Sequence, residues 1–217
     1  RRVALNTIRV VGASPVKLVL GFMVATAFLS MWVSNSATAM MMVPIGPAVV
    51  SEVTGLTPAQ IKEGSTVSGK SDLNFGRALM LGIAFAASIG GLATIIGTPP
   101  NAILVGMVKK MYNYDITFFN WLLVGFPLAF ITLFVSWLML TRFLFPTTEF
   151  RMGDAGSVID DEIKALGPMS KAEKSILFIA TCMAVLWIIS GFVFKHIPAL
   201  KMVKDSTIAI GGAVVLF

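Results

Sequence analysis

The fold is decided by an uncharged stretch that carries a polar cluster at its middle. Residues 18–50 read LVLGFMVATAFLSMWVSNSATAMMMVPIGPAVV and lie between Lys17 and Glu52. A straight helix of this length would measure about 50 Å at about 1.5 Å per residue, whereas the hydrocarbon core of a bilayer is about 30 Å thick. The stretch must therefore break inside the membrane, and we expect the break at Ser34-Asn35-Ser36-Ala37-Thr38.

A second uncharged stretch shows the same combination. Residues 78–108 read ALMLGIAFAASIGGLATIIGTPPNAILVGMV, which as one helix would be about 46 Å long. Gly90-Gly91 and Thr98-Pro99-Pro100 interrupt it, because glycine weakens a helix and proline blocks it. Irregular backbone at this depth survives only where it is buried in protein or lines a cavity. Paired broken helices with polar tips are typical of the binding site of a secondary transporter.

Composition supports a membrane protein and excludes several other classes. The chain is 56% hydrophobic and 13% charged, with a mean hydropathy of +0.86, which excludes an ordinary soluble domain. The net charge of +6 comes from Lys and Arg that flank apolar stretches, without a basic recognition helix, so nucleic acid is not the expected partner. Neither broken stretch contains Asp, Glu, Lys, Arg or His, so an intramembrane proton relay has no carrier there.

The first stretch is predicted to be a re-entrant hairpin. Ser14-Pro15 supplies an N-cap and a first-turn proline for a helix from Val16 to about Val33, roughly 27 Å long. The second arm, residues 39–50, is shorter and contains two prolines. Two half-length arms around a polar tip enter and leave the membrane on one side.

The remaining segments complete an all-α polytopic membrane protein. Trp121 and Trp137 are predicted to anchor one span at the two membrane interfaces, and Ser170-Lys171-Ala172-Glu173 is a capping-box pattern that opens another. Residues 159, 163 and 166 suggest a short surface helix. The predicted order is an interfacial basic segment (1–15), the re-entrant hairpin (16–50), a cytoplasmic loop (51–77), a broken transmembrane helix (78–111), a transmembrane helix (118–141), a cytoplasmic connector (142–174), a transmembrane helix (175–194) and the start of a truncated one (206–217).

Basic residues predict the orientation. If the N-terminus, the loop and the connector share one side, that side holds twelve Lys and Arg residues, against five on the other. An excess of Lys and Arg marks the cytoplasmic face. The count depends on the re-entrant hairpin, because a spanning first stretch would move the loop to the opposite side.

Five oxygen-bearing side chains crowd the first tip within nine residues, and they predict a cation site. An isolated intramembrane hydroxyl is explained more simply by a hydrogen bond to a carbonyl of its own helix. Five at a forced break favour a binding site instead, and neutral hydroxyl and carbonyl oxygens suit a hard monovalent cation such as Na⁺. The five are Ser30, Ser34, Asn35, Ser36 and Thr38.

The same breaks could also hold an anion. The helical arms that begin near Ala37 and near Asn101 are expected to present unpaired N–H groups and the positive end of a half-helix dipole. A carboxylate or sulfate there would be balanced by nearby cations.

These two motifs together resemble the divalent anion–sodium symporter family. The resemblance rests on Ser34-Asn35-Ser36-Ala37-Thr38 and on the run from Ser88 to Asn101, SIGGLATIIGTPPN, and it covers essentially the whole chain. It implies one half of an inverted-repeat transporter that couples entry of Na⁺, the co-transported ion, to import of dicarboxylates such as succinate, malate and fumarate. It also implies a homodimer in the lipid bilayer of the cell membrane, with a second tip beyond Phe217.

The resemblance also assigns residues. It implies a Na⁺ site at Ser30, Ser34, Asn35 and a carbonyl of Gly90 or Gly91, and substrate contacts at Asn35 and Ser36. Thr98, Pro99 and Asn101 of the second break are further expected substrate contacts. Ser36 stands where the family usually has Thr, which leaves the hydroxyl but removes a methyl group.

Three alternatives remain open from the sequence. One is a related broken-helix transporter or exporter for sulfate, citrate or arsenite. An intramembrane enzyme would need a nucleophile–base pair or metal ligands at depth, and a structural membrane subunit would not need two polar breaks.

Overall fold

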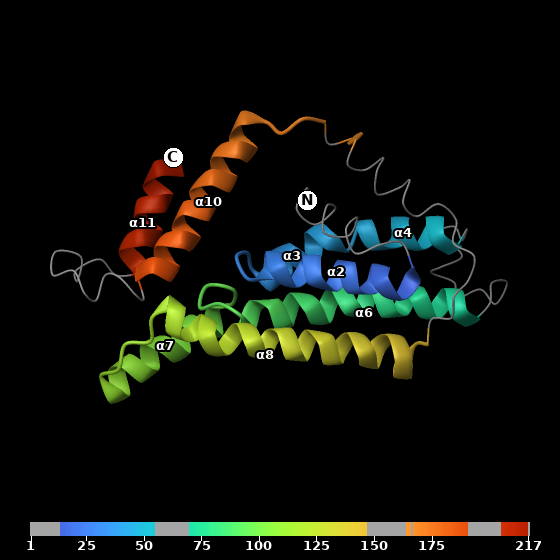
Figure 1. The fold of residues 1–217 in the computed structure, drawn as a ribbon, viewed down its shortest axis with the longest axis horizontal. Helices are drawn as coiled ribbons and strands as arrows, with labels where there is room; N and C mark the ends of the chain where they lie inside the picture. Colours follow the sequence, from blue (N-terminus) through green and yellow to red (C-terminus); the bar gives the residue numbers. More distant parts are fainter. Residues whose placement is uncertain (1–13, 55–69, 147–163, 166, 191–204, 217) are drawn as a thin grey trace.

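The computed structural model describes residues 14–54, 70–146, 164–165, 167–190 and 205–216, and all regular secondary structure in these ranges is helical (Figure 1). Two predicted segments lie largely outside these ranges. They are the surface helix at residues 159–166 and the interfacial segment 1–15. The helices are α2 (Pro15–Ser30), α3 (Asn35–Met42), α4 (Ile45–Thr54), α6 (Lys70–Leu92), α7 (Pro99–Tyr112), α8 (Phe118–Leu138), the π-helix η1 (Met139–Leu144), α10 (Lys171–Ile189) and α11 (Asp205–Leu216).

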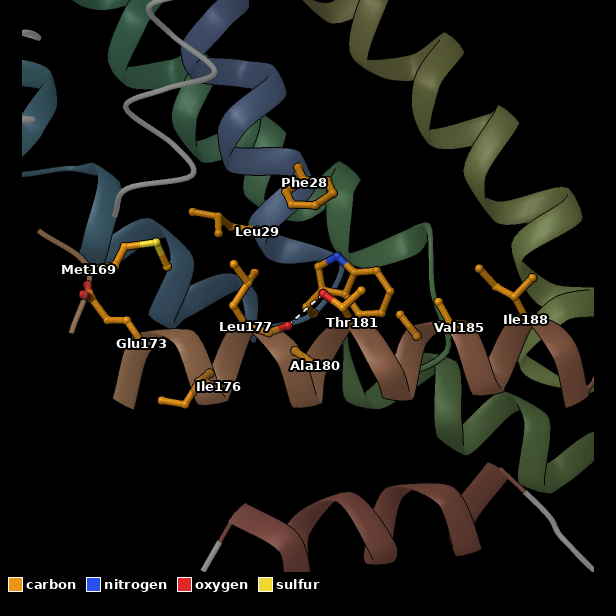
Figure 2. Close-up of a pocket in the computed structure, with 12 residues that line it drawn as sticks. Phe28, Leu29, Met169, Glu173, Ile176, Leu177, Ala180, Thr181, Val185 and Ile188 are labelled. Carbon is orange, nitrogen blue, oxygen red and sulfur yellow. Dashed lines mark hydrogen bonds between the residues drawn. The ribbon is translucent and has the colours of Figure 1, made fainter. Parts of the chain in front are cut away.

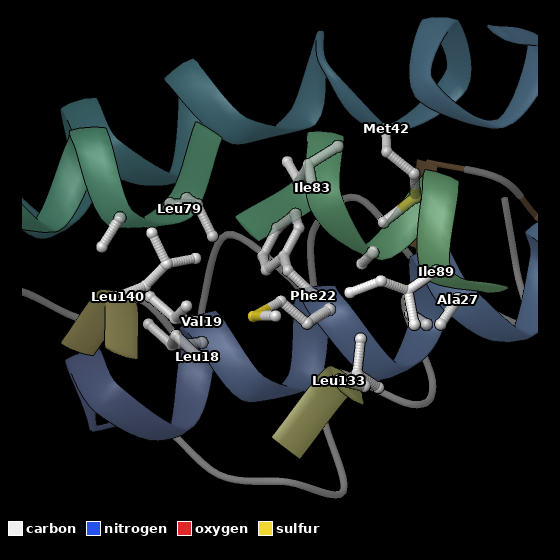
Figure 3. Close-up of a cluster of buried hydrophobic side chains, with 14 of the residues drawn as sticks. Leu18, Val19, Phe22, Ala27, Met42, Leu79, Ile83, Ile89, Leu133 and Leu140 are labelled. Atoms are coloured by element: carbon white, nitrogen blue, oxygen red, sulfur yellow. The ribbon is translucent and has the colours of Figure 1, made fainter. Parts of the chain in front are cut away.

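The core lies between α2 and α6, which run side by side, and α8 packs against both of them (Figure 1). Figure 3 shows Leu18, Val19 and Phe22 of α2 facing Leu79 and Ile83 of α6. All five side chains are at most 1% exposed. Lipid tails are as apolar as these side chains, so the hydrophobic effect does not hold two membrane helices together. Close packing does, and small residues permit it. This tight pair brings the two predicted breaks to the same end of the structure.

An aromatic cluster joins that end to α10 and α11. The ring of Trp32, just after α2, stacks on Phe118 at the start of α8 with 6.3 Å between centroids. Phe118 in turn stacks on Trp187 of α10 at 5.0 Å. Asp205 completes the junction, because its Oδ2 accepts a hydrogen bond from the Phe118 N–H and its backbone oxygen accepts one from Trp187 Nε1.

Within the part of the chain that the structure describes, three helices are long and apolar enough to cross a membrane: Leu73–Leu92, Phe118–Leu144 and Lys171–Ile189. These lengths and the exclusively helical secondary structure of the described ranges confirm the prediction of a polytopic all-α membrane protein. The 16-residue α2 is about 24 Å long, shorter than a bilayer core. A re-entrant course for α2 and α3 therefore stays a hypothesis consistent with helix length.

Two predicted helix starts are confirmed by their caps. Ser14 accepts a hydrogen bond from the Lys17 N–H and precedes a first-turn proline. Ser170 and Glu173 form a reciprocal capping box, with each side chain accepting from the other residue's N–H. The last predicted segment also begins close to its expected position, with α11 starting at Asp205.

Several predicted boundaries are wrong. The loop expected at 51–77 is helical at both ends, because α4 reaches Thr54 and α6 already begins at Lys70. The helix α6 also continues through Gly90-Gly91 to Leu92, where the prediction ended it near residue 89. The second hairpin arm is two helices, since Pro44 separates α3 from α4. Pro47 is tolerated because it lies in the first turn of α4.

The two predicted interfacial tryptophans have internal partners. Trp121 Nε1 donates to the Leu92 carbonyl and Trp137 Nε1 donates to the Val16 carbonyl, both at 3.0 Å. The interfacial position of the two rings stays a prediction, because an indole N–H can bond to the protein at a membrane interface. In this fold the two side chains hold α8 against the end of α6 and the start of α2.

Candidate functional site

Three oxygen atoms meet where the end of α2, the start of α3 and the middle of α6 come together. The Ser30 hydroxyl lies 2.8 Å from Asn35 Oδ1 and 2.6 Å from the backbone oxygen of Ala87. Ser30 is completely buried, Ala87 is 3% exposed and Asn35 is half-buried. The cluster thus sits below the surface, with Asn35 on its accessible side.

This oxygen cluster is short of hydrogens. A serine hydroxyl carries one hydrogen, whereas the amide oxygen and the backbone carbonyl are both acceptors. The flipped amide would donate from Nδ2 to the Ser30 hydroxyl and satisfy both short contacts, whereas with Asn35 Oδ1 toward Ser30 only one of the two is a hydrogen bond at a time. Such an arrangement suits a cation, which all three oxygens could face without competition.

Gly90 and Gly91 allow the chains to approach this closely. A Cβ atom on Gly90 would overlap the backbone oxygen of Ala27 in α2, and one on Gly91 would overlap Asn35 Oδ1. Gly90 thus lets the α2 backbone come close to α6, and Gly91 lets the Asn35 amide do the same. Their role in the structure is close packing within α6 and not the helix break that the sequence suggested.

The break itself lies between Leu92 and Pro99, and Thr94 ties it to the first tip. The Thr94 hydroxyl donates to the Met31 carbonyl at 2.5 Å and accepts from the Gly97 N–H at 3.1 Å. Thr94 is fully buried, and a Cβ atom on Gly97 would lie 2.6 Å from the Gly91 oxygen. The loop is therefore folded back on the end of α6.

Side chains from α7 and α8 satisfy the carbonyls at the end of α6. The last carbonyls of a helix receive no hydrogen bond from an N–H of the same helix, so they need donors from elsewhere. Asn101 Nδ2 donates to the Gly91 and Thr94 oxygens, each at 2.8 Å, while Trp121 donates to the Leu92 oxygen. Asn101 is 5% exposed, so these bonds lie in the interior.

The two helix N-termini differ in what they offer an anion. Ser34 caps α3 by accepting from the Ala37 N–H, and the first N–H groups of α3 have no acceptor within the helix. The N-terminus of α7 contradicts the expectation of unpaired N–H groups. Pro99 and Pro100 have no N–H, and the Asn101 N–H donates to the Thr98 oxygen. Of the two helix N-termini at the breaks, both in the described part of the chain, α3 is the one that keeps N–H groups without an acceptor in its helix.

The predicted site residues fall into two groups. Ser30, Asn35 and Gly91 meet at the oxygen cluster, Gly90 packs beside them, and Asn101 binds the Gly91 oxygen. In the described contacts, no hydrogen bond links the others to this cluster; Ser34, Ser36 and Pro99 are exposed and Thr98 is half-buried.

The Ala87 carbonyl was missed by sequence reasoning. A carbonyl has no signature of its own, but Ala87 and Gly91 are four residues apart and so share one face of α6. Two small residues at this spacing indicate where another backbone can approach a helix. That pattern could have pointed to this face.

Thr38 carries an unusual hydroxyl. It is fully buried, and its Oγ1 has no hydrogen-bond partner, which holds for no other buried side-chain oxygen or nitrogen among the described residues. Leaving a buried hydroxyl unpaired costs about 1–3 kcal/mol.

A separate apolar groove of about 500 Å³ lies between the end of α2 and α10 (Figure 2). Phe28 and Leu29 face Leu177, Val185 and Ile188 across it. Two of its polar groups have partners in the protein, because the Thr181 hydroxyl donates to the Leu177 oxygen and Glu173 accepts from the Ser170 N–H. A carboxylate and apolar walls do not suit an anion, so the groove is distinct from the polar site.

Comparison with known proteins gives a consistent result. The family described as the sodium:sulfate symporter transmembrane region matches residues 1–217. A sodium-dependent dicarboxylate transporter of Staphylococcus aureus strain USA300 is 39% identical over 216 residues, covering 100% of this chain and 40% of the relative. A transporter of the same name from Staphylococcus saprophyticus is 38% identical over the same share of both chains. The chain spans about 40% of the length of these relatives.

Proposed function

This chain belongs to the sodium:sulfate symporter family, and from that premise we propose that the whole protein couples Na⁺ entry to the import of dicarboxylates. The family and the relatives are transporters by name, so the chain is assigned to a multi-pass membrane transporter of the cell membrane and not to an enzyme. Because the chain spans 40% of its relatives, the activity belongs to the whole protein, and this chain supplies part of the site.

The oxygen cluster carries the Na⁺ part of the proposal. We assign Na⁺ to Ser30, Asn35 and the Ala87 carbonyl, with Ser34 and the backbone of Gly90 and Gly91 beside them. The supporting observation is that two neutral oxygens, Asn35 Oδ1 and the Ala87 carbonyl, lie 2.8 and 2.6 Å from Ser30 Oγ below the surface. All these oxygens are neutral, so no proton need leave when the ion binds.

The substrate is proposed to bind at the N-terminus of α3. A carboxylate there would meet unpaired N–H groups, the positive end of the helix dipole and the exposed Ser36 hydroxyl. The Asn35 amide can serve both ligands, because its oxygen faces the cation cluster while its nitrogen remains a donor. Thr98 and Pro99 would line the side of the bound carboxylate that faces away from α3. A bound Na⁺ next to this position would offset the charge of the dianion.

The remaining expectations concern the whole protein. We propose that α2 and α3 enter and leave the membrane on the cytoplasmic side, and that α6 and α7 together cross it as one broken helix. The second half of the relatives' length is proposed to supply a matching tip, and the working protein is proposed to be a homodimer. The short α2 and the break before Pro99 support the first two points.

Uptake into proteoliposomes tests the proposal. The whole protein should accumulate labelled succinate when Na⁺ is added outside and should not do so with K⁺ or choline. Asn35→Ala should abolish this uptake with normal membrane expression, whereas Asn120→Ala, which removes an amide at the start of α8 away from the cluster, should not. Uptake by wild type that is equal with and without Na⁺, or normal uptake by Asn35→Ala, would contradict it.

Sulfate is a second candidate substrate, because it appears in the name of the matching family. Both substrates are dianions, and the neutral oxygens and N–H groups of the site do not distinguish them by charge. Competition separates them. If dicarboxylates are the substrates, unlabelled malate and fumarate will suppress succinate uptake at concentrations at which sulfate does not.

A further inference from the structure

Asn101 occupies a position from which it can act on the oxygen cluster without touching a ligand. Its two Nδ2 hydrogens point to two backbone oxygens, those of Gly91 and Thr94, at 2.8 Å each. The orientation of the amide is not arbitrary, because a flipped amide would place its oxygen against two carbonyl oxygens. Both donors of this side chain are therefore used inside the protein.

The Gly91 peptide connects Asn101 to the cluster in two ways. In an α-helix the Gly91 N–H points to the oxygen of Ala87, four residues earlier, which is one of the three cluster oxygens. The Gly91 Cα lies against Asn35 Oδ1, which is the second. The hydrogen bond from Asn101 to the Gly91 carbonyl therefore restrains Gly91, which the Ala87 oxygen and Asn35 Oδ1 both contact.

The end of α6 leaves the Gly91 carbonyl without a donor from its own helix. Past Leu92 the chain leaves the helix, so the Gly91 and Leu92 carbonyls lose the donors that a continuing helix would provide. Asn101 of α7 and Trp121 of α8 replace those donors, one for each carbonyl. Without them the last turn of α6 would be free to fray.

We propose that Asn101 is a positioning residue that sets Na⁺ affinity by clamping the Gly91 and Thr94 carbonyls, and not a substrate contact. This inference rests on the proposed function, since it assigns Na⁺ to the neighbouring cluster. It differs from the substrate role that the sequence suggested for Asn101. A positioning role predicts weaker Na⁺ binding with little change in succinate affinity, whereas a substrate contact predicts weaker succinate binding with unchanged Na⁺ binding.

The experiment measures binding of labelled Na⁺ to the purified whole protein without substrate, and then binding of succinate at saturating Na⁺. Asn101→Asp keeps the size of the side chain but replaces its donors with acceptors. It should raise the Na⁺ concentration for half-saturation about threefold to tenfold, in line with the loss of one net hydrogen bond at the Gly91 carbonyl. Succinate affinity at saturating Na⁺ should change less than about twofold.

The matched control is Asn74→Asp, near the start of α6, the helix whose other end Asn101 of α7 contacts. Asn74 is also buried, and its Nδ2 also donates to a backbone oxygen, that of Pro146, at 3.3 Å. It should leave Na⁺ half-saturation unchanged. If Asn74→Asp weakens Na⁺ binding as much as Asn101→Asp does, the effect is general destabilisation and the inference is overturned.

A milder pair keeps the test decisive if Asn101→Asp does not fold. Trp121→Phe and Trp137→Phe each remove one indole N–H that donates to a carbonyl at 3.0 Å, the first at the break and the second at the start of α2. Trp121→Phe should weaken Na⁺ binding and Trp137→Phe should not. Equal Na⁺ binding by both variants overturns the clamp.

The remaining outcomes are distinguishable. Loss of succinate affinity at saturating Na⁺, with unchanged Na⁺ half-saturation, would make Asn101 a substrate contact and overturn the inference while leaving the proposed function standing. If wild type binds no Na⁺, the proposed function fails and the inference fails with it.

Discussion

Gly91 of α6 lies against Asn35 of α3 so closely that a Cβ atom on Gly91 would overlap the Asn35 Oδ1 atom. The same Oδ1 atom lies 2.8 Å from the Ser30 hydroxyl. Any side chain at position 91 must therefore displace the Asn35 amide from the oxygen cluster. The glycine is required here by space and not by backbone conformation, because it lies within a regular helix.

Gly91→Ala should weaken Na⁺ activation of uptake. Removing the Asn35 oxygen from a cation loses an interaction with a charged group, worth about 1.5–3 kcal/mol. The Na⁺ concentration for half-maximal uptake should therefore rise at least about tenfold. Gly106→Ala is the control, since a Cβ atom at position 106 of α7 meets nothing within 4 Å. Identical Na⁺ activation curves for Gly91→Ala and wild type would contradict the placement of Asn35.

Ser36→Thr should retain uptake and change substrate affinity. The added methyl group is worth about 0.8 kcal/mol if it is buried against the substrate, which corresponds to about a fourfold change. Ser36→Ala should weaken substrate binding because it removes the hydroxyl. Uptake of succinate, malate, citrate and sulfate by the three variants measures this. Equal apparent affinities for every substrate would show that position 36 does not contact the anion.

Thr38→Val should stabilise the protein by about 1 kcal/mol or leave it unchanged. The substitution keeps the shape and removes a buried hydroxyl that has no partner. Thr26→Val is the comparison, because the equally buried Thr26 hydroxyl donates to the Phe22 carbonyl at 2.6 Å. Thermal unfolding in detergent checks both variants. Destabilisation by Thr38→Val of more than about 1 kcal/mol would show that this hydroxyl has a partner in the whole protein.

The sequence predicted both breaks only to within a few residues, from length, polarity and proline. The first lies at residues 31–34, since residues 35–38 already belong to α3, and the second at residues 93–98. The Ser14 and Ser170 caps and the helix that begins at Pro99 follow from the same local rules. Long uncharged stretches between charged residues also predicted the membrane spans.

The contacts that the sequence did not predict join residues that lie far apart in the chain. The Ala87 carbonyl becomes part of the site because Ser30, on another helix, faces it. The hydrogen bonds of Trp121 and Trp137 to the carbonyls of Leu92 and Val16 likewise join residues that are distant in the chain. Gly90-Gly91 looked like a helix break because glycine weakens helices, but close packing against α2 and α3 overrides this weak preference.

Cysteine labelling tests the predicted orientation. In a background where the exposed native Cys182 is replaced by serine, cysteines at positions 64 and 154 should react with impermeant reagents only from the cytoplasm. A cysteine at Asn113, the residue that ends α7, should react only from outside. Labelling of positions 64 and 154 from opposite sides would mean that the first stretch crosses the membrane, and the re-entrant hairpin would be wrong.

Equilibrium binding of labelled Na⁺ to the purified Ser30→Ala protein tests the central claim most directly. Ser30 contributes the one hydroxyl that faces both other oxygens of the cluster. Ser88→Ala is the control, because that hydroxyl lies exposed on α6 and donates to the Ala84 carbonyl. We expect Ser30→Ala to weaken Na⁺ binding about tenfold or more, with unchanged binding by Ser88→Ala. Binding of Na⁺ by folded Ser30→Ala with wild-type affinity and amount would show that the cation does not occupy this cluster.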